Sequence, residues 1–144
     1  MSAVAQRPAP VLGQRFPDWP AHLNATIERA RRTPFCWTRH NCASFAADCV
    51  AAMTGVHLHG QFEHMMTSSR RAVLHSADLD LWVDQVLGAE RRVPLPFCGR
   101  GDVVLLRTPA GPALGICTGI TAAAAGPDGI AFLPMSEALC AWRV

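Results

Sequence analysis

The hydrophobic pattern of the chain changes at two prolines, Pro94 and Pro96. Before them, apolar residues recur every three or four positions, which is the period of an amphipathic helix. After them, short apolar runs are separated by turn sequences rich in Pro and Gly, a pattern typical of an antiparallel sheet. Helices that come first and strands that follow predict an α+β fold.

Helix signals divide the first part of the chain into separate segments. Asp18 can cap a first helix, which Thr33-Pro34 would end. Asn41 can cap a second helix, and Gly55 is suited to the left-handed residue that follows its last turn. We expect helices over residues 18–32, 41–53, 68–75 and 78–87, with a polar loop from residue 56 that contains His57, His59 and His64.

The second part predicts a small sheet of four to five strands. The expected strands cover residues 102–108, 113–118, 120–125 and 130–134. Residues 1–17 contain three prolines and little periodicity, so we expect an extended N-terminal arm that could dock on a neighbouring protein. With 144 residues, 50% of them apolar, residues 18–144 are expected to form one α+β domain with a substantial core.

Charge and hydropathy exclude several classes of partner. The net charge is only +2, and the basic residues are scattered, so nucleic acid is not expected as a ligand. Ser44 and Asp48 interrupt the longest apolar helix candidate, and we therefore expect no membrane span. Gln6 and Arg7 lie where a signal peptide would be apolar, which favours synthesis in the cytoplasm.

The cysteines and histidines show no metal-binding spacing. The six cysteines contain no C-x-x-C pair, and free thiols are expected in a protein without an export signal. His57, His59 and His64 lack a carboxylate or cysteine at a suitable interval, so we expect neither a metal nor a cofactor. Small apolar packing positions are expected for Cys36, Cys49, Cys98, Cys117 and Cys140.

Cys42 has the position that could carry chemistry. It is expected at the start of a buried helix, where partial positive charge and unpaired N–H groups can lower the pKa of a thiol and stabilise an oxyanion. Two interpretations remain open at this point. Cys42 is either a functional thiol or a small residue at a crowded helix start.

The residues around Cys42 resemble a known family. Residues 35–45, FCWTRHNCASF, resemble the F-x-W-G-x-x-D-C-x-x-F segment of the NlpC-type peptidoglycan peptidases, which are papain-like cysteine peptidases. More narrowly, they resemble a branch of that superfamily encoded in phage and prophage tail gene clusters. Four further segments agree in order and spacing: Ala52-Met53-Thr54-Gly55, residues 101–106, Gly115-Ile116 and the ending Ala141-Trp142-Arg143-Val144. The resemblance covers residues 19–144 and implies a papain-like fold.

The chain departs from the family at the catalytic histidine. In the active peptidases the second strand opens with a histidine that acts as base toward the thiol and as acid toward the leaving amine. Ala113 occupies that position here, and no histidine follows His75. Asn41 and Thr38 also replace an acidic residue and a glycine of the motif. Because positioned acid–base catalysis contributes about 10² to 10⁴ in rate, the resemblance implies a scaffold poorly equipped for amide hydrolysis.

The expected function is therefore that of a structural protein of a phage or prophage tail tip or hub, built on a degenerate NlpC-type fold. Its partners would be other tail proteins, and it would be found in the host cytoplasm during assembly and in the virion tail afterwards. The alternative is an active cysteine peptidase or amidase that opens peptidoglycan during DNA entry, with Cys42 as nucleophile and His40 or His57 as an unconventional base. A third class, a redox or metal protein that uses several thiols, remains as a further alternative.

Overall fold

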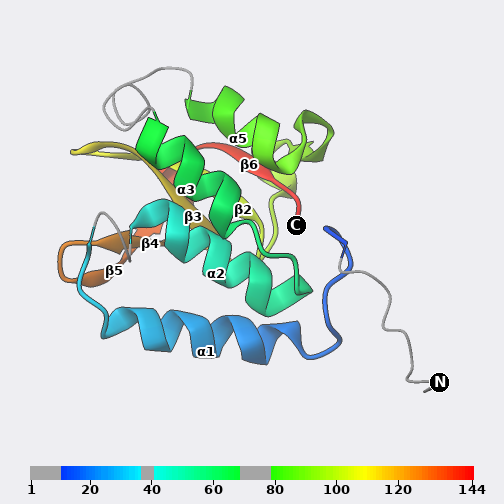
Figure 1. Ribbon diagram of the computed structural model, residues 1–144, viewed down its shortest axis with the longest axis horizontal. Coiled ribbons are helices and arrows are strands. Elements are labelled where there is room, and N and C mark those ends of the chain that lie inside the picture. The colour runs from blue at the N-terminus through cyan, green and yellow to red at the C-terminus, as the bar shows by residue number, and fades with distance from the viewer. Residues whose placement is uncertain (1–10, 37–40, 69–78) are drawn as a thin grey trace.

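The computed structural model describes residues 11–36, 41–68 and 79–144. In these ranges helices pack on one antiparallel sheet, which confirms the α+β prediction (Figure 1). The helices are α1 (Trp19–Arg31), α2 (Cys42–Thr54), α3 (His59–Ser68) and α5 (Leu79–Leu87), and the 3-10 turns are η1 (Ala89–Arg91), η2 (Leu95–Phe97) and η3 (Met135–Glu137). The strands are β1 (Arg92–Val93), β2 (Val103–Thr108), β3 (Gly111–Cys117), β4 (Thr121–Gly126), β5 (Gly129–Pro134) and β6 (Ala138–Trp142).

The sheet has six strands in the order β1-β6-β2-β3-β4-β5. Consecutive hairpins join β2 to β5, and these strands confirm the four that were expected. The expected total of four to five strands was too low, because β6 returns to pair with β2 on its free side and β1 pairs with β6. Both additional strands are short and pair only with segments distant in sequence, so local pattern did not reveal them.

Helices α1 and α2 lie where the sequence predicts them. Asn41 accepts a hydrogen bond from the Ser44 backbone N–H at 2.9 Å, and Ser44 Oγ accepts one from the Asn41 backbone N–H at 2.8 Å. This reciprocal capping box starts α2, and Gly55 ends it with φ 79°. Asp18 does precede α1, but its carboxylate makes no capping bond and instead contacts His22 at 2.9 Å.

The loop expected around the three histidines is wrong from residue 59 onward, because those residues form α3. Leu58 and Phe62, four residues apart, are 4% and 1% exposed, so the start of the helix is anchored by apolar residues one turn apart. The helix expected over residues 68–75 lies almost entirely outside the described residues, and α5 confirms the one expected over residues 78–87. Among helices in the described ranges, none is long and apolar enough to cross a membrane.

Helix α2 is the centre of the main core. It packs against α1, α3, β3 and β4 (Figure 1), and most of its residues are buried. Phe45, Cys49, Val50 and Met53 are each 0% exposed. The prediction that Cys49 is a core residue is thereby confirmed.

The opposite face of the sheet is also buried. Val104, Leu106, Cys117 and Ala141 are 0% exposed and form a second apolar cluster, to which Met135 and neighbouring residues add partial cover. The first four residues of β2 are all buried, since alternate side chains enter the two clusters. The strand therefore has a continuous apolar sequence rather than an alternating one.

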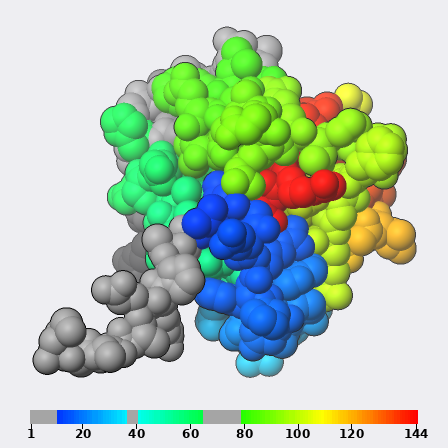
Figure 2. All heavy atoms as spheres, turned by 90° about the vertical axis from the view of Figure 1, so that its right-hand side faces the viewer, coloured from blue at the N-terminus to red at the C-terminus, as the bar shows by residue number. Residues whose placement is uncertain are grey.

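The described part of the N-terminal segment lies against its own domain. Leu12 packs on the main core, and the Phe16 backbone N–H donates to the Met53 carbonyl at 2.8 Å. In Figure 2 this blue segment lies beside the red C-terminal residues. Residues 11–17 thus contact both the end of α2 and the end of the chain.

The hairpin between β4 and β5 supplies a test of how closely the sheet approaches α1. Gly129 has φ 108°, and an added Cβ would lie 2.4 Å from the Arg31 carbonyl oxygen at the end of α1. Gly119 has φ 117° in the β3–β4 turn, and an added Cβ would meet nothing within 4 Å. Alanine at either position incurs backbone strain of about 1–2 kcal/mol. Because Gly129→Ala adds a backbone clash, we expect it to lower the free energy of unfolding by at least about 1 kcal/mol more than Gly119→Ala. Urea titration measures the difference, and equal losses would contradict close contact between the hairpin and α1.

Candidate functional site

Cys42 is the first residue of α2, at the end of the helix that meets β3. Its side chain is only 8% exposed, and the Leu114 backbone lies within hydrogen-bonding reach of its sulfur. Ala113, which the resemblance aligned with the histidine of the peptidases, directly precedes Leu114 on β3 and packs on the same core as Cys42. The structure therefore brings the two key positions of the sequence analysis, Cys42 and Ala113, into one region.

Burial raises the pKa of the Cys42 thiol above its ordinary value of 9.0. Hydrogen bonds from the backbone at Leu114, Ala43 and Cys42 itself act in the opposite direction, but they do not outweigh the loss of solvation. The N–H groups at the helix start thus act on this pKa in the expected downward direction, but burial has the larger effect. The cost of placing a thiolate in an apolar core exceeds the stabilisation that the helix end supplies.

In the described part of the chain, no titratable side chain contributes to the shifted pKa of Cys42. An imidazolium near the sulfur would favour the thiolate and lower the pKa. The strands of the sheet contain no histidine. Among the described residues, the groups that bear on this thiol are thus apolar side chains of the core and backbone groups.

The histidines considered as bases have different locations. His57 is exposed and follows the C-terminal end of α2, whose 13 residues place its two ends roughly 18 Å apart at about 1.5 Å per residue. His57 is therefore not placed beside Cys42. His59 contacts Asp48 at 2.7 Å, and its ring lies 5.8 Å from that of His57. His40 lies outside the described residues.

The described residues hold no group of three or more His, Cys, Asp or Glu side chains that could ligate a metal ion. His57 and His59 lie near one another. Among the interactions of the described residues, the one contact that these two histidines make with a carboxylate is the ion pair between His59 and Asp48. The chemistry that these residues support is that of a surface ion pair when His59 is protonated.

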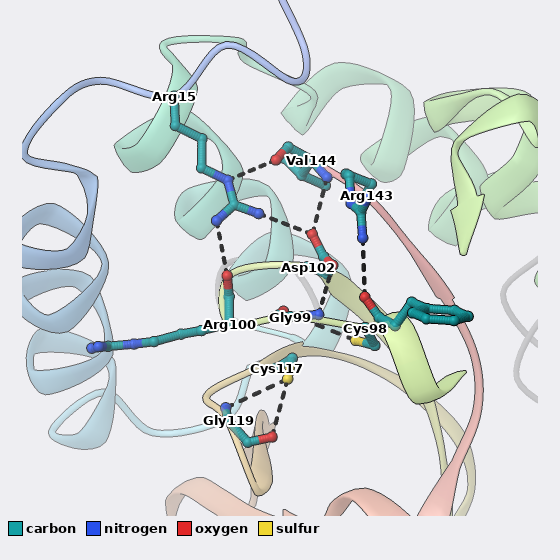
Figure 3. A network of polar contacts seen from close by, with 10 residues as sticks. Arg15, Cys98, Gly99, Arg100, Asp102, Cys117, Gly119, Arg143 and Val144 are labelled. Atoms are coloured by element: carbon teal, nitrogen blue, oxygen red, sulfur yellow. Dashed lines mark hydrogen bonds and ion pairs between the residues drawn. The ribbon is translucent and has the colours of Figure 1, made fainter. Parts of the chain in front are cut away.

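A buried carboxylate, Asp102, organises a second polar site that the sequence analysis did not identify. Asp102 is 1% exposed and accepts hydrogen bonds from Arg15 Nη2 at 2.9 Å, the Gly99 backbone N–H at 2.9 Å and the Val144 backbone N–H at 3.3 Å (Figure 3). These three donors come from the N-terminal segment, the turn before β2 and the end of the chain. Asp102 therefore holds together segments that are far apart in sequence.

Arg15 completes this network. Its Nε donates to the Val144 carbonyl at 2.7 Å, and its Nη1 donates to the Arg100 carbonyl at 2.8 Å. Gly101 has φ 94°, and an added Cβ would lie 2.7 Å from Arg15 Nη1, so the guanidinium needs a glycine at this turn. The sequence offered one signal for this network, an acidic residue directly before an apolar strand. A carboxylate buried at such a position needs a cationic partner. Nothing local to the sequence distinguishes Arg15 from the other arginines.

A second ion-pair network joins α5 to the sheet edge. Arg92 donates to both carboxylate oxygens of Asp84 at 2.7 Å and to Asp80 at 2.8 Å, while Trp142 Nε1 donates to Asp84 at 2.8 Å. Hydrogen bonding to Arg92 lowers the pKa of Asp84. Trp142 is 0% exposed and belongs to the main core, so its hydrogen bond to Asp84 joins α5 to a buried residue of the sheet.

The raised pKa of Cys42 predicts low thiol reactivity. At pH 8 we expect iodoacetamide to alkylate Cys42 in the folded protein at least about tenfold more slowly than in the urea-unfolded chain, because burial excludes the reagent and suppresses the thiolate. Raising the pH to 9.5 should increase the rate of alkylation much more in the unfolded chain than in the folded protein. Peptide mass spectrometry of timed samples measures both rates. Equal rates at pH 8 would show that Cys42 is accessible and ionised.

The Asp102 network predicts a large stability effect. Asp102→Ala should lower the free energy of unfolding by about 3–5 kcal/mol, because it leaves the partly buried Arg15 guanidinium without its carboxylate. Glu28→Ala is the control, since it removes an exposed carboxylate that pairs with Arg31 at 3.1 Å, and it should cost less than about 0.5 kcal/mol. Chemical denaturation measures both. Similar small losses in the two variants would contradict the anchoring role of Asp102.

Comparison with known proteins adds a family assignment. A family model described as Domain of unknown function (DUF6950) matches residues 14–144. This range contains Arg15, Cys42, Asp102 and Val144, so both sites lie within the matched segment. Searches of curated proteins and of solved structures gave no match. Since the model matches most of the chain, the protein belongs to the family described as Domain of unknown function (DUF6950).

Proposed function

We propose that this chain is a non-catalytic structural protein of a phage or prophage tail tip or hub, built on a degenerate papain-like, NlpC-type fold. The observation that carries the proposal is the state of Cys42. Its sulfur is buried, its thiol pKa is raised, and the adjoining strand has Ala113 where the resembled peptidases have a histidine.

The arrangement of α2 and β3 supports the choice of scaffold. A papain-like enzyme presents its cysteine at the start of a buried helix, beside the strand that holds the base. Here Cys42 opens α2, and α2 packs on β3, which contains Ala113 and Leu114. The spatial relation agrees with what the motif order implies, while the group needed for proton transfer is replaced by a methyl.

The chemistry of Cys42 argues against hydrolysis as the present role. Each unit by which a thiol pKa exceeds the ambient pH lowers the thiolate fraction about tenfold, so burial removes most of the nucleophile at neutral pH. Loss of a positioned acid–base then removes a further factor of about 10² to 10⁴. A structural role, by contrast, requires only that the Cys42 side chain fills the space at the start of α2.

The surface of the domain supports association with other proteins. Phe97 and Ile120 are 70% and 90% exposed. Both large apolar side chains lie in turns that adjoin the sheet, and exposed apolar groups of this kind are typical of protein contacts. On this proposal such positions contact other tail proteins, the chain accumulates in the host cytoplasm during assembly, and it is retained in the virion tail afterwards.

The first test separates the structural role from peptidase activity. Purified protein, the Cys42→Ala variant and a Cys140→Ala control are incubated with cell-wall sacculi, and released peptides are measured by mass spectrometry. We expect no release above background from any of the three. Release by the parent and the Cys140→Ala control but not by Cys42→Ala would overturn the proposal and favour the peptidase or amidase alternative, with Cys42 as nucleophile.

The second test determines whether the protein is part of the tail and is needed to form it. Particles are purified after induction of the phage or prophage that encodes the chain, with the gene intact, deleted, or replaced by the Cys42→Ala variant. We expect the protein in purified tails, loss of normal tails on deletion, and full restoration by Cys42→Ala. Absence of the protein from tails together with normal tails in the deletion would contradict the structural role.

A further inference from the structure

A surface hollow of about 490 Å³ lies beside the Asp102 network. Four arginines, Arg15, Arg91, Arg100 and Arg143, contribute to its lining, and Asp102 is the acidic side chain that lines it. The volume is within the range of about 300–1,000 Å³ that is typical of small-ligand sites. The hollow is therefore large enough for a ligand group, and its lining is strongly cationic.

The cationic charge of the hollow is only partly neutralised. Arg15 pairs with Asp102 at 2.9 Å, so this carboxylate is already occupied by one guanidinium. Arg91 Nη2 donates instead to the Leu12 carbonyl at 2.8 Å, and Arg143 Nη2 donates to the Phe97 carbonyl at 3.0 Å. Within the described chain, neither Arg91 nor Arg143 has a carboxylate at ion-pair distance.

Arg100 also contributes positive charge to the lining, but its side chain points in a different direction. Its Nη2 donates to the Asn24 side-chain oxygen at 2.6 Å, and in Figure 3 its side chain points away from the Asp102 network. The lining thus has four positive side chains against one negative side chain. A terminal carboxylate at Val144 would make the comparison four to two, and the hollow would remain cationic.

The arginines are held in place while keeping donors available. A guanidinium has five N–H donors, and the hydrogen bonds of Arg91 and Arg143 each use one nitrogen on a neutral backbone carbonyl. Gly13 has φ 86°, and an added Cβ would lie 3.1 Å from Arg91 Nη1, so the glycine leaves room for that guanidinium. In the view of Figure 3, Arg15 and Arg143 lie on either side of Val144. Such preorganised donors favour planar or tetrahedral oxyanions.

We propose that this hollow binds a compact oxyanion, the phosphate or carboxylate group of a ligand, through Arg91 and Arg143, with Arg15 held in position by Asp102. The proposal goes beyond the structural role in a tail and does not depend on it, since it concerns a different face from the Cys42 thiol and makes no use of the peptidase scaffold. The pairing of Asp102 with Arg15 matters here, because an unpaired carboxylate in the hollow would repel the ligand.

The test uses the purified full-length chain with two probes, inorganic pyrophosphate and tricarballylate, at constant ionic strength. Binding is measured by isothermal titration calorimetry and by the ligand-dependent rise in melting temperature. We expect saturable binding of at least one probe, and the probe that binds more tightly identifies phosphate or carboxylate as the preferred group. No saturable binding of either probe up to 10 mM would overturn the proposal.

Variants separate the hollow from general attraction to a basic protein. Arg143→Gln and Arg91→Gln should each weaken binding at least about tenfold, because each removes a charge-assisted contact. Arg143→Lys keeps the charge without the planar fork and should bind with intermediate affinity. Arg107→Gln removes an exposed arginine near the far end of β2, outside the hollow, and should leave binding unchanged.

The remaining outcomes are also decisive. Circular dichroism first establishes that each variant is folded. Arg91→Gln removes the hydrogen bond from Arg91 to the Leu12 carbonyl and can alter the fold of the N-terminal segment. In that case the comparison of Arg143→Gln with Arg143→Lys carries the test. An equal loss of affinity in Arg107→Gln and Arg143→Gln would show attraction to net charge alone and overturn the proposal. Because these measurements involve neither cell wall nor tails, their failure is distinct from failure of the structural role.

Discussion

Helix α2 is enclosed by α1, α3, β3 and β4, and this enclosure sets both the environment of Cys42 and the placement of the sheet. An apolar helix packed on several sides cannot keep water at its first residue, and Cys42 is accordingly 8% exposed. The same enclosure orients the sheet, since β3 and β4 supply one side of the packing and the hairpins place β2 and β5 beside them. The chemistry at Cys42 is therefore set by packing before any neighbouring polar group is considered.

Two opposing physical effects meet at Cys42, and their relative size decides its state. The N-terminus of a helix favours a thiolate by a modest amount, whereas desolvation in an apolar core costs much more. Backbone hydrogen bonds at Leu114 and Ala43 reduce the cost but do not reverse it. A reactive cysteine in the same position would need an ionised partner or access to water. Within the described residues, no titratable side chain contributes to the pKa of this thiol.

The Asp102 network lies near the opposite end of α2 from Cys42. Asp102 ties the N-terminal segment, the turn before β2 and the chain end together, and Arg15 extends that network to two backbone carbonyls. Its charges are buried where hydrogen bonds satisfy them, which is the condition under which a buried ion pair is tolerated. Arg91 and Arg143 are held instead by neutral carbonyls, so cationic charge remains at the surface hollow beside the network.

Elements that depend on interactions between neighbouring residues could be predicted before the fold was known. The capping box of Asn41 and Ser44, the left-handed Gly55 and the Gly-Pro turns between strands follow from preferences of residues close in sequence. For that reason α1, α2, α5 and β2 to β5 were predictable, as was the position of Cys42 at a helix start. The α3 helix was missed because Leu58, directly before it, and Phe62 within it are buried positions flanked by polar residues.

Three features follow only from the three-dimensional fold: the pairing of β6 with β2, the ion pair between Arg15 and Asp102, and the raised thiol pKa of Cys42. Each depends on contacts between segments that are distant along the chain, or on the water that those contacts exclude. Sequence pattern identifies which residues can form a helix, a turn or a thiolate. It does not specify which distant segment covers Cys42, and the loss of solvation on burial is what raises the pKa of its thiol.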